Sequence, residues 1–190
     1  MTLEGNRSPI ADPRMRGSIV GLTLVSSSTP KRASSWILIL LQDSSLHDLA
    51  RKYALALEAI ALQTRHIIDK LNNAGHSIRA LYLSGSQAQN GALMRLLANT
   101  CDMPVVLPRS HAVSVVLGAA MLGRFATIRD PPDPAIALWD VMQEMTPTGT
   151  VVRPAAGEKE RKLLEVKYRV FLESIDIQRR WRNEIDAVVN

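Results

Sequence analysis

The feature that most constrains the fold is an alternation of short apolar runs and helical segments in the middle of the chain. An apolar run over 78–83 leads into a tight turn, and a helix over about 88–99 is expected after it. A second apolar run over 104–107 is followed by a helix over about 112–126. Strands that alternate with helices in this way predict an α/β fold.

A long amphipathic helix is expected from about Asp43, and Asn73 and Gly75 are suited to end it. Its main stripe, interrupted at Thr64, consists of apolar residues spaced by threes and fours: Leu46, Leu49, Tyr53, Leu57, Ile60, Ile67 and Leu71. A second apolar flank consists of Leu55, Leu62 and Ile68. Apolar residues on more than one side favour a helix buried between layers.

The remaining segments are expected to be a mixture of loops, one strand and further helices. The pattern predicts a loop over 5–16, a strand over 18–24, a loop over 25–35, and helices over about 135–145 and 158–187 with an irregular stretch between them. In the helix over 112–126, Gly118, Ala119 and Ala120 would permit a close approach to a sheet.

Length and composition indicate a globular domain with a core of its own. The chain has 190 residues and a single cysteine, so no disulfide can form within it, which fits a reducing compartment. Its longest apolar run, over 36–41, is far shorter than the about 20 residues of a membrane-spanning helix. The first residues lack the apolar region of a secretory signal. We therefore expect a cytoplasmic protein that does not bind membranes.

The charge pattern argues against a nucleic-acid partner. The formal net charge is +5, which by itself favours anionic partners. However, acidic and basic residues nearly balance over 158–186, and no run of five basic residues occurs. A basic binding face would require Lys and Arg to cluster.

The best candidate for a functional site is the turn that contains Ser84, Gly85 and Ser86. Gly85 allows backbone to approach a ligand closely, and the helix that follows offers free N–H groups and the positive end of its dipole to a phosphate. On these local features alone, an ordinary tight turn between a strand and a helix is the more economical interpretation.

Four segments in order resemble the C-terminal part of the FGGY family of carbohydrate kinases. They read Leu-Ser-Gly-Ser-Gln-Ala-Gln-Asn (83–90), Leu-Met-Arg-Leu-Leu-Ala-Asn (93–99), Met-Pro-Val-Val-Leu-Pro (103–108) and Val-Leu-Gly-Ala-Ala-Met-Leu-Gly (116–123). The opening loop with Asn-Arg-Ser-Pro (6–9) and the end of the chain resemble the pentulose kinase, ribulokinase-like branch. The resemblance covers residues 5–186 apart from one stretch.

The resemblance implies the actin/hexokinase-like kinase fold, built from two ribonuclease-H-like domains, of which this chain is the second half only. It also implies ATP and Mg²⁺ as cofactors and a small sugar, preferably a pentulose such as ribulose, as substrate. By position, Gly85 and Ser86 would approach the nucleotide, and Gln87 and Asn90 would lie beside its adenine or ribose. Ser84 stands where many members have Gly, which puts the phosphate contact in question.

The same resemblance places the first phosphate loop and the catalytic Asp of the family in the first domain. Asp12 lies in an Ala-Asp-Pro setting that does not match the motif of the base. We therefore assign no catalytic residue here and expect the chain to be inactive alone. Arg7 and Asp12 would either line the cleft between domains or belong to a surface loop.

One stretch, residues 25–42, has no counterpart in the family and is expected to be an unstructured insertion. Without it, the strand that ends at Leu24 would join the helix that begins at Asp43 by a connection of ordinary length. Val25 and Gln42 can be encoded by codons that carry the usual intron borders, so we hypothesise a retained intron. A genuine surface loop is the alternative.

The other reactive side chains suggest structural roles. His66 lies on a mostly apolar helix and is interpreted as a core or flank residue, and Cys101 as a buried structural thiol. The histidines lack the spacing of metal ligands, so no metal site is expected. Two other functions stay open: a non-catalytic nucleotide-binding or protein-association module, and a basic nucleic-acid binder.

Overall fold

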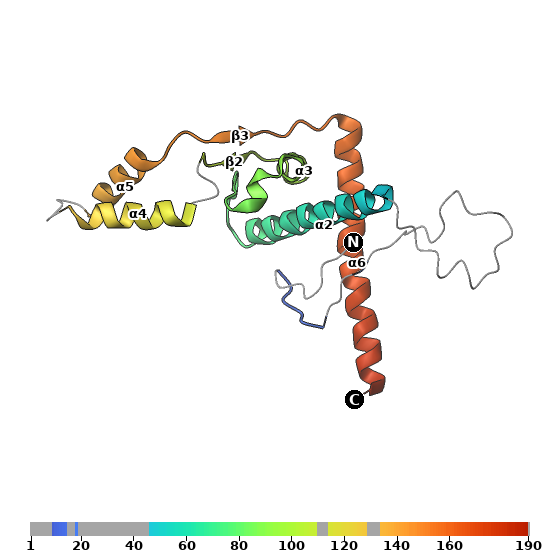
Figure 1. Cartoon of the computed structure of the whole chain (residues 1–190). Helices are drawn as coiled ribbons and strands as arrows, with labels where there is room; N and C mark the ends of the chain where they lie inside the picture. Colours follow the sequence, from blue (N-terminus) through green and yellow to red (C-terminus); the bar gives the residue numbers. More distant parts are fainter. Residues whose placement is uncertain (1–8, 15–17, 19–45, 110–113, 129–133, 190) are drawn as a thin grey trace. The chain divides into compact units, whose positions relative to one another are not determined.

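The computed structural model describes residues 9–14, 18, 46–109, 114–128 and 134–189 (Figure 1). These residues form two compact units. Unit 1 contains the described residues up to Lys70 and those from Lys162 onward, and unit 2 runs from Leu71 to Arg161. The predicted strand over 18–24, except Ser18, and the predicted insertion over 25–42 lie outside the described residues.

Unit 1 is built on two long helices, α2 (Leu46–Asn73) and α6 (Glu158–Val189). Gly75, with φ of +99°, follows the end of α2 as predicted. The core of the unit is a cluster of Leu62 on α2 with Tyr168, Phe171 and Ile175 on α6, against which Ile10 and Leu172 pack. Burial of these side chains is the main force that joins the two helices.

The predicted main stripe of α2 is not the side that forms this core. Leu46, Leu49 and Tyr53 are more than half exposed, whereas Leu62 and Ile68 on the predicted second flank are only 5% exposed. The expectation of a helix buried between layers is therefore wrong for the first turns. The reason is that the cluster with α6 forms on the second flank, through Leu62.

Polar contacts at the edge of the core fix α2 to α6. The Arg65 guanidinium pairs with Glu165 at 2.7 Å and lies 4.2 Å above the ring of Tyr168. The Tyr168 hydroxyl donates a hydrogen bond of 2.6 Å to Asp69 on α2. Tyr168 therefore buries its apolar ring without leaving its hydroxyl unpaired, so its burial carries no penalty for a lost hydrogen bond.

Unit 2 contains a three-stranded sheet in the order β1 (Leu81–Tyr82), β2 (Val105–Leu107), β3 (Thr150–Val152). β1 is parallel to β2, and the connection between them contains helix α3 (Gly91–Cys101), so that they form a βαβ unit. The core of the unit contains Leu93, Met94, Leu97 and Ala98 of α3 and Val105 of β2, all at most 3% exposed. This arrangement confirms the predicted α/β class.

β3 lies in the stretch that was expected to be irregular, so that expectation is wrong at 150–152. The strand pairs antiparallel with β2, with Leu107 opposite Thr150. Its approach depends on Gly149, where a Cβ atom would lie 2.5 Å from the carbonyl oxygen of Leu107. The run of Pro147, Gly149 and Pro154 therefore brackets a short strand rather than excluding one.

Two further helices, α4 (Ser114–Ala126) and α5 (Pro134–Met145), pack on each other and include the buried side chains Met121 and Val141 (Figure 1). The expected role of the small residues in α4 is not observed, because Ala119 and Ala120 are exposed and a Cβ atom at Gly118 would meet no atom within 4 Å. Among the described helices, none is long and apolar enough to cross a membrane.

Candidate functional site

The predicted tight turn after β1 is present, and it has an unusual backbone conformation. The N–H of Leu83 still bonds to Val106 of β2, and the chain then leaves the sheet through Ser84 and Gly85. Gly85 has φ of +90° and ψ of −177°, a conformation that is essentially restricted to glycine. No atom lies within 4 Å of the place that a Cβ would take, so the backbone at Gly85 is open to a ligand.

A single turn of 3-10 helix separates this glycine from α3. It spans Ser86–Gln89 and is closed by a hydrogen bond of 3.1 Å from the Ala88 N–H to the Gly85 carbonyl. The predicted helix from about 88 is therefore corrected: the α-helix begins at Gly91, and Asn90 caps it by accepting a bond of 3.2 Å from the Leu93 N–H.

The structure thus brings the predicted site residues together on one short connection. Ser84, Ser86 and Gln87 are exposed, and Gly85 and Asn90 are half-buried. The first turn of α3 carries no acidic residue, so the positive end of the helix dipole is not neutralised there. What sequence reasoning missed at Asn90 is its capping role, although Asn is among the preferred capping residues.

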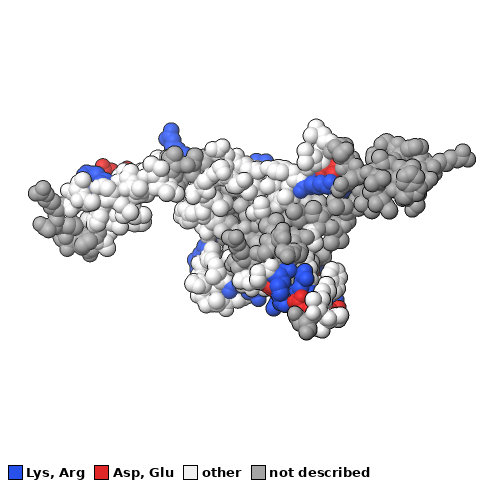
Figure 2. Space-filling model, turned by 60° about the horizontal axis from the view of Figure 1, so that its bottom comes forward, with Lys and Arg blue, Asp and Glu red and all other residues white. Residues whose placement is uncertain are grey.

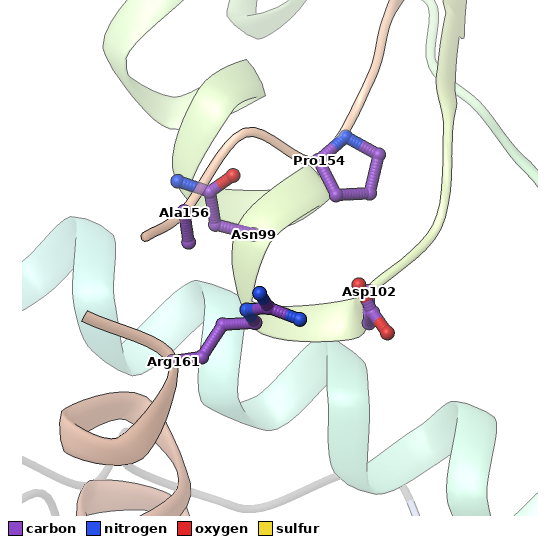
Figure 3. Close-up of a pocket in the computed structure, with 5 residues that line it drawn as sticks. All are labelled: Asn99, Asp102, Pro154, Ala156 and Arg161. Atoms are coloured by element: carbon purple, nitrogen blue, oxygen red, sulfur yellow. The ribbon is translucent and has the colours of Figure 1, made fainter. Parts of the chain in front are cut away.

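A shallow pocket of about 160 Å³ lies at the opposite end of α3 and was not predicted (Figure 3). Asn99, Asp102, Pro154, Ala156 and Arg161 line it. The side chain of Asn99 makes two hydrogen bonds. Its Oδ1 accepts one of 2.9 Å from the Ala155 N–H, and its Nδ2 donates one of 3.0 Å to the Glu160 carboxylate. These contacts tie the segment after β3 to α3, which gives the pocket a structural explanation.

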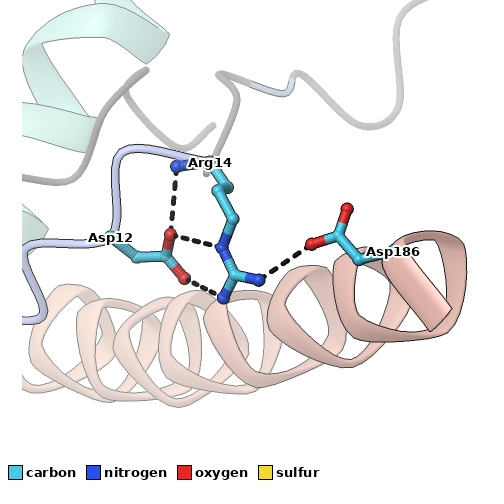
Figure 4. A network of polar contacts seen from close by, with 3 residues as sticks. All are labelled: Asp12, Arg14 and Asp186. Carbon is cyan, nitrogen blue, oxygen red and sulfur yellow. Dashed lines mark hydrogen bonds and ion pairs between the residues drawn. The ribbon is translucent and has the colours of Figure 1, made fainter. Parts of the chain in front are cut away.

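Asp12, the acidic residue of the opening loop, is engaged in an ion-pair network (Figure 4). The Arg14 guanidinium donates to both Asp12 oxygens at 3.0 and 3.1 Å and to Asp186 on α6 at 2.8 Å. The hydrogen bonds from Arg14 lower the pKa of Asp12 below its usual value, and those to both carboxylates raise the pKa of Arg14. Of the two interpretations of this loop, the contacts favour a structural one for Asp12.

The remaining predicted side chains lie away from the turn. His66 is 5% exposed, which confirms a core position, whereas Cys101 is half-buried rather than buried. Within the described ranges, no three His, Cys, Asp or Glu residues lie close enough to hold a metal ion. On the face shown in Figure 2, the basic side chains lie in separate groups, some beside acidic ones, and the absence of a nucleic-acid partner stays a prediction.

The family of the chain follows from its similarity to a known family model. A family model described as the C-terminal domain of the FGGY family of carbohydrate kinases matches residues 1–127, a range that contains the whole turn. The chain belongs to the FGGY family. The resemblance inferred from the four ordered segments is therefore confirmed.

Curated FGGY relatives are considerably longer than this chain. A FGGY carbohydrate kinase domain-containing protein of Xenopus laevis is 34% identical over 94% of the chain, which spans 28% of that relative. The D-ribulokinase of Saccharomyces cerevisiae is 42% identical over 65% of the chain and 15% of its own length. The chain thus spans less than a third of the length of these FGGY relatives.

Solved FGGY structures show the same fold. The xylulose kinase of Rhodospirillum rubrum matches with a TM-score of 0.56 and 20% identity, over 90% of this chain and 29% of the other. The glycerol kinase of Plasmodium falciparum with ADP gives 0.56 and 21% over the same shares. The predicted actin/hexokinase-like fold, represented by its C-terminal domain, is confirmed.

Proposed function

We propose that the chain is the nucleotide-binding half of an ATP-dependent carbohydrate kinase whose substrate is a pentulose such as ribulose. Membership of the FGGY family supports the reaction class. The 42% identity to a relative named D-ribulokinase supports the preference for ribulose. The observation that carries the nucleotide site is the open glycine conformation at Gly85, one turn of 3-10 helix ahead of the N-terminus of α3.

The turn can bind a phosphate chain through backbone groups and short polar side chains. Backbone at Gly85 can approach an anion without a Cβ between them, and the hydroxyls of Ser84 and Ser86 can donate hydrogen bonds. The start of α3 would contribute its dipole, and the family resemblance assigns Gln87 and Asn90 to the nucleoside part. Mg²⁺, when bound with ATP, would neutralise phosphate charge and keep several waters of its own.

Deprotonation of the sugar hydroxyl is the step for which we assign no group among the described residues. Phosphoryl transfer needs a base that accepts this proton. Asp12 is a poor candidate, because Arg14 occupies both of its oxygens and lowers its pKa. We therefore propose that the chain alone does not phosphorylate sugars.

The phosphate contact can be tested by calorimetry with ATP, ADP and adenosine on the purified chain. If the turn holds phosphates, affinity should decrease stepwise as phosphates are removed and should weaken at high salt. Equal affinity for the three ligands would contradict a phosphate site at this turn.

Catalysis can be tested by mixing the chain with ATP and Mg²⁺ and a panel of pentuloses, with D-ribulose first. We expect no sugar phosphate above the uncatalysed background. Turnover at an ordinary kinase rate of about 1–100 per second would contradict the proposal that the chain alone does not phosphorylate sugars.

A protein-association module is the second candidate, and exposed apolar side chains favour it. Val115 and Val116 on α4 are 87% and 69% exposed, and Ile136 and Trp139 on α5 are 60% and 56% exposed. Exposed apolar surface of this kind is often a protein contact. Light scattering at increasing protein concentration would favour this candidate if association occurs and ATP does not bind.

A further inference from the structure

His66 lies inside the interface between α2 and α6, where its ring takes no part in the proposed nucleotide site. The residue is 5% exposed and belongs to α2. Its ring meets Phe171 of α6 edge to face, with centroids 6.2 Å apart and planes at 80°. Phe171 is a member of the core cluster of unit 1, so the imidazole forms part of the packing that joins the two helices.

One ring nitrogen of His66 is isolated from hydrogen-bonding groups. Nδ1 is buried and has no hydrogen-bond partner in the part of the chain that the structure describes. A neutral imidazole can leave one nitrogen without a proton, and the cost of that orphan acceptor is moderate. A protonated imidazole donates from both nitrogens, so Nδ1–H would then be a buried donor on a charged ring without an acceptor.

The charged groups around the ring do not compensate for such a charge. On α2, Lys70 disfavours the protonated ring and Asp69 favours it, and on α6 Asp176 favours it. Asp69 is already engaged, since it accepts the hydrogen bond of Tyr168. The opening loop packs against the same cluster through Ile10. The charged residues of this loop, Asp12 and Arg14, pair with each other, and Arg14 also pairs with Asp186. Burial is the largest effect, and it lowers the pKa of His66.

We propose that His66 is a proton-sensitive joint between α2 and α6: the neutral ring packs against Phe171, and protonation loosens the two helices. The protonated ring would leave the apolar cluster for water, which opens unit 1 while the buried side chains of α3 and β2 keep the core of unit 2. The chain would thereby respond to mild acidification in unit 1, whereas the proposed nucleotide turn belongs to unit 2.

The direction of the pH effect follows from the lowered pKa. In the unfolded chain His66 has the ordinary pKa of 6.5, whereas in the folded chain it binds a proton only at lower pH. The stabilisation from neutral His66 is thus fully present above pH 6.5 and is lost as the pH falls from 6.5 through the folded-state pKa. Each pKa unit of lowering corresponds to about a tenfold change in the equilibrium between closed and open forms.

Amide hydrogen exchange of the whole chain at pH 7.5 and 5.5, corrected for intrinsic rates, tests the joint. Peptides from α2 and α6 around His66 and Phe171 should lose protection at pH 5.5 in the wild type. His66→Phe, which keeps an aromatic ring but cannot titrate, should remove this pH dependence. His47→Gln on the exposed side of the same helix is the matched control and should behave as the wild type does.

An equal loss of protection in wild type and His66→Phe would overturn the proposal. Should His66→Phe fail to fold, the titration of His66 in the wild type, followed by its Cε1 proton resonance in NMR spectra, decides instead. An apparent pKa below 6.5 is expected, and a pKa at or above that value would refute the joint.

Discussion

At the scale of single residues, two glycines do different work in unit 2. Gly85 is needed for its conformation, because its φ of +90° is rarely adopted by other residues. Gly149 is needed for space, because a side chain there would run into the backbone of Leu107. Sequence alone indicated the first through its place between a strand and a helix. The second could not be foreseen, since the contact joins residues that are far apart in the chain.

The close contact of Gly149 with the backbone of Leu107 predicts that a side chain added at Gly149 destabilises the sheet. Gly149→Ala should lower the free energy of unfolding of unit 2 by about 1–3 kcal/mol, because the new methyl group forces β3 away from β2. Urea unfolding followed by circular dichroism measures the change. Gly123→Ala inside α4, where a Cβ meets no atom within 4 Å, serves as the control and should not destabilise the unit.

Asn90 combines a capping role that the structure shows with a ligand role that we propose. Asn90→Ala should cost about 1 kcal/mol of stability, since the Leu93 N–H loses its acceptor. Asn90→Ser can still cap the helix and should retain most of this stability in the same urea titration. If alanine and serine destabilise the chain equally, the cap does not contribute as the structure indicates.

At the scale of elements, the helices and the strands differed in how far the sequence specified them. The periodic patterns located α3, α4, α5 and α6 to within a few residues, because helix signals extend over several turns. β3 was missed because three residues next to Gly149 carry too short a pattern. The expectation that α2 is buried between layers failed for its first turns, because the apolar pattern alone does not show that Leu46, Leu49 and Tyr53 stay exposed.

The interface of α2 and α6 should depend on the side chains of one face of α6. Phe171→Ala should destabilise unit 1 by about 3–5 kcal/mol, because it removes a buried ring from the core cluster. Trp181→Ala removes a larger side chain from the same helix, but this residue is 56% exposed, so a change within about 0.5 kcal/mol is expected. Thermal unfolding of both variants should show this order, and the reverse order would place the core elsewhere.

At the scale of the whole molecule, family membership and the turn support one account of the chain. The FGGY match covers residues 1–127, and the turn that presents Gly85 lies inside it. The predicted site residues are adjacent in sequence, so the sequence could bring them together without knowledge of tertiary contacts. Groups that come from distant segments, such as the lining of the pocket beside Asn99, could not be foreseen in this way.

The measurement that tests the central claim most directly is ATP binding by calorimetry to wild type, Gly85→Val and Gly75→Val. Both glycines lie in unit 2, have positive φ and face open space, so the two substitutions should cost similar strain. We predict that Gly85→Val abolishes ATP binding because its side chain blocks the turn, whereas Gly75→Val binds as the wild type does. Unchanged binding by folded Gly85→Val would contradict the proposal that this turn receives the nucleotide.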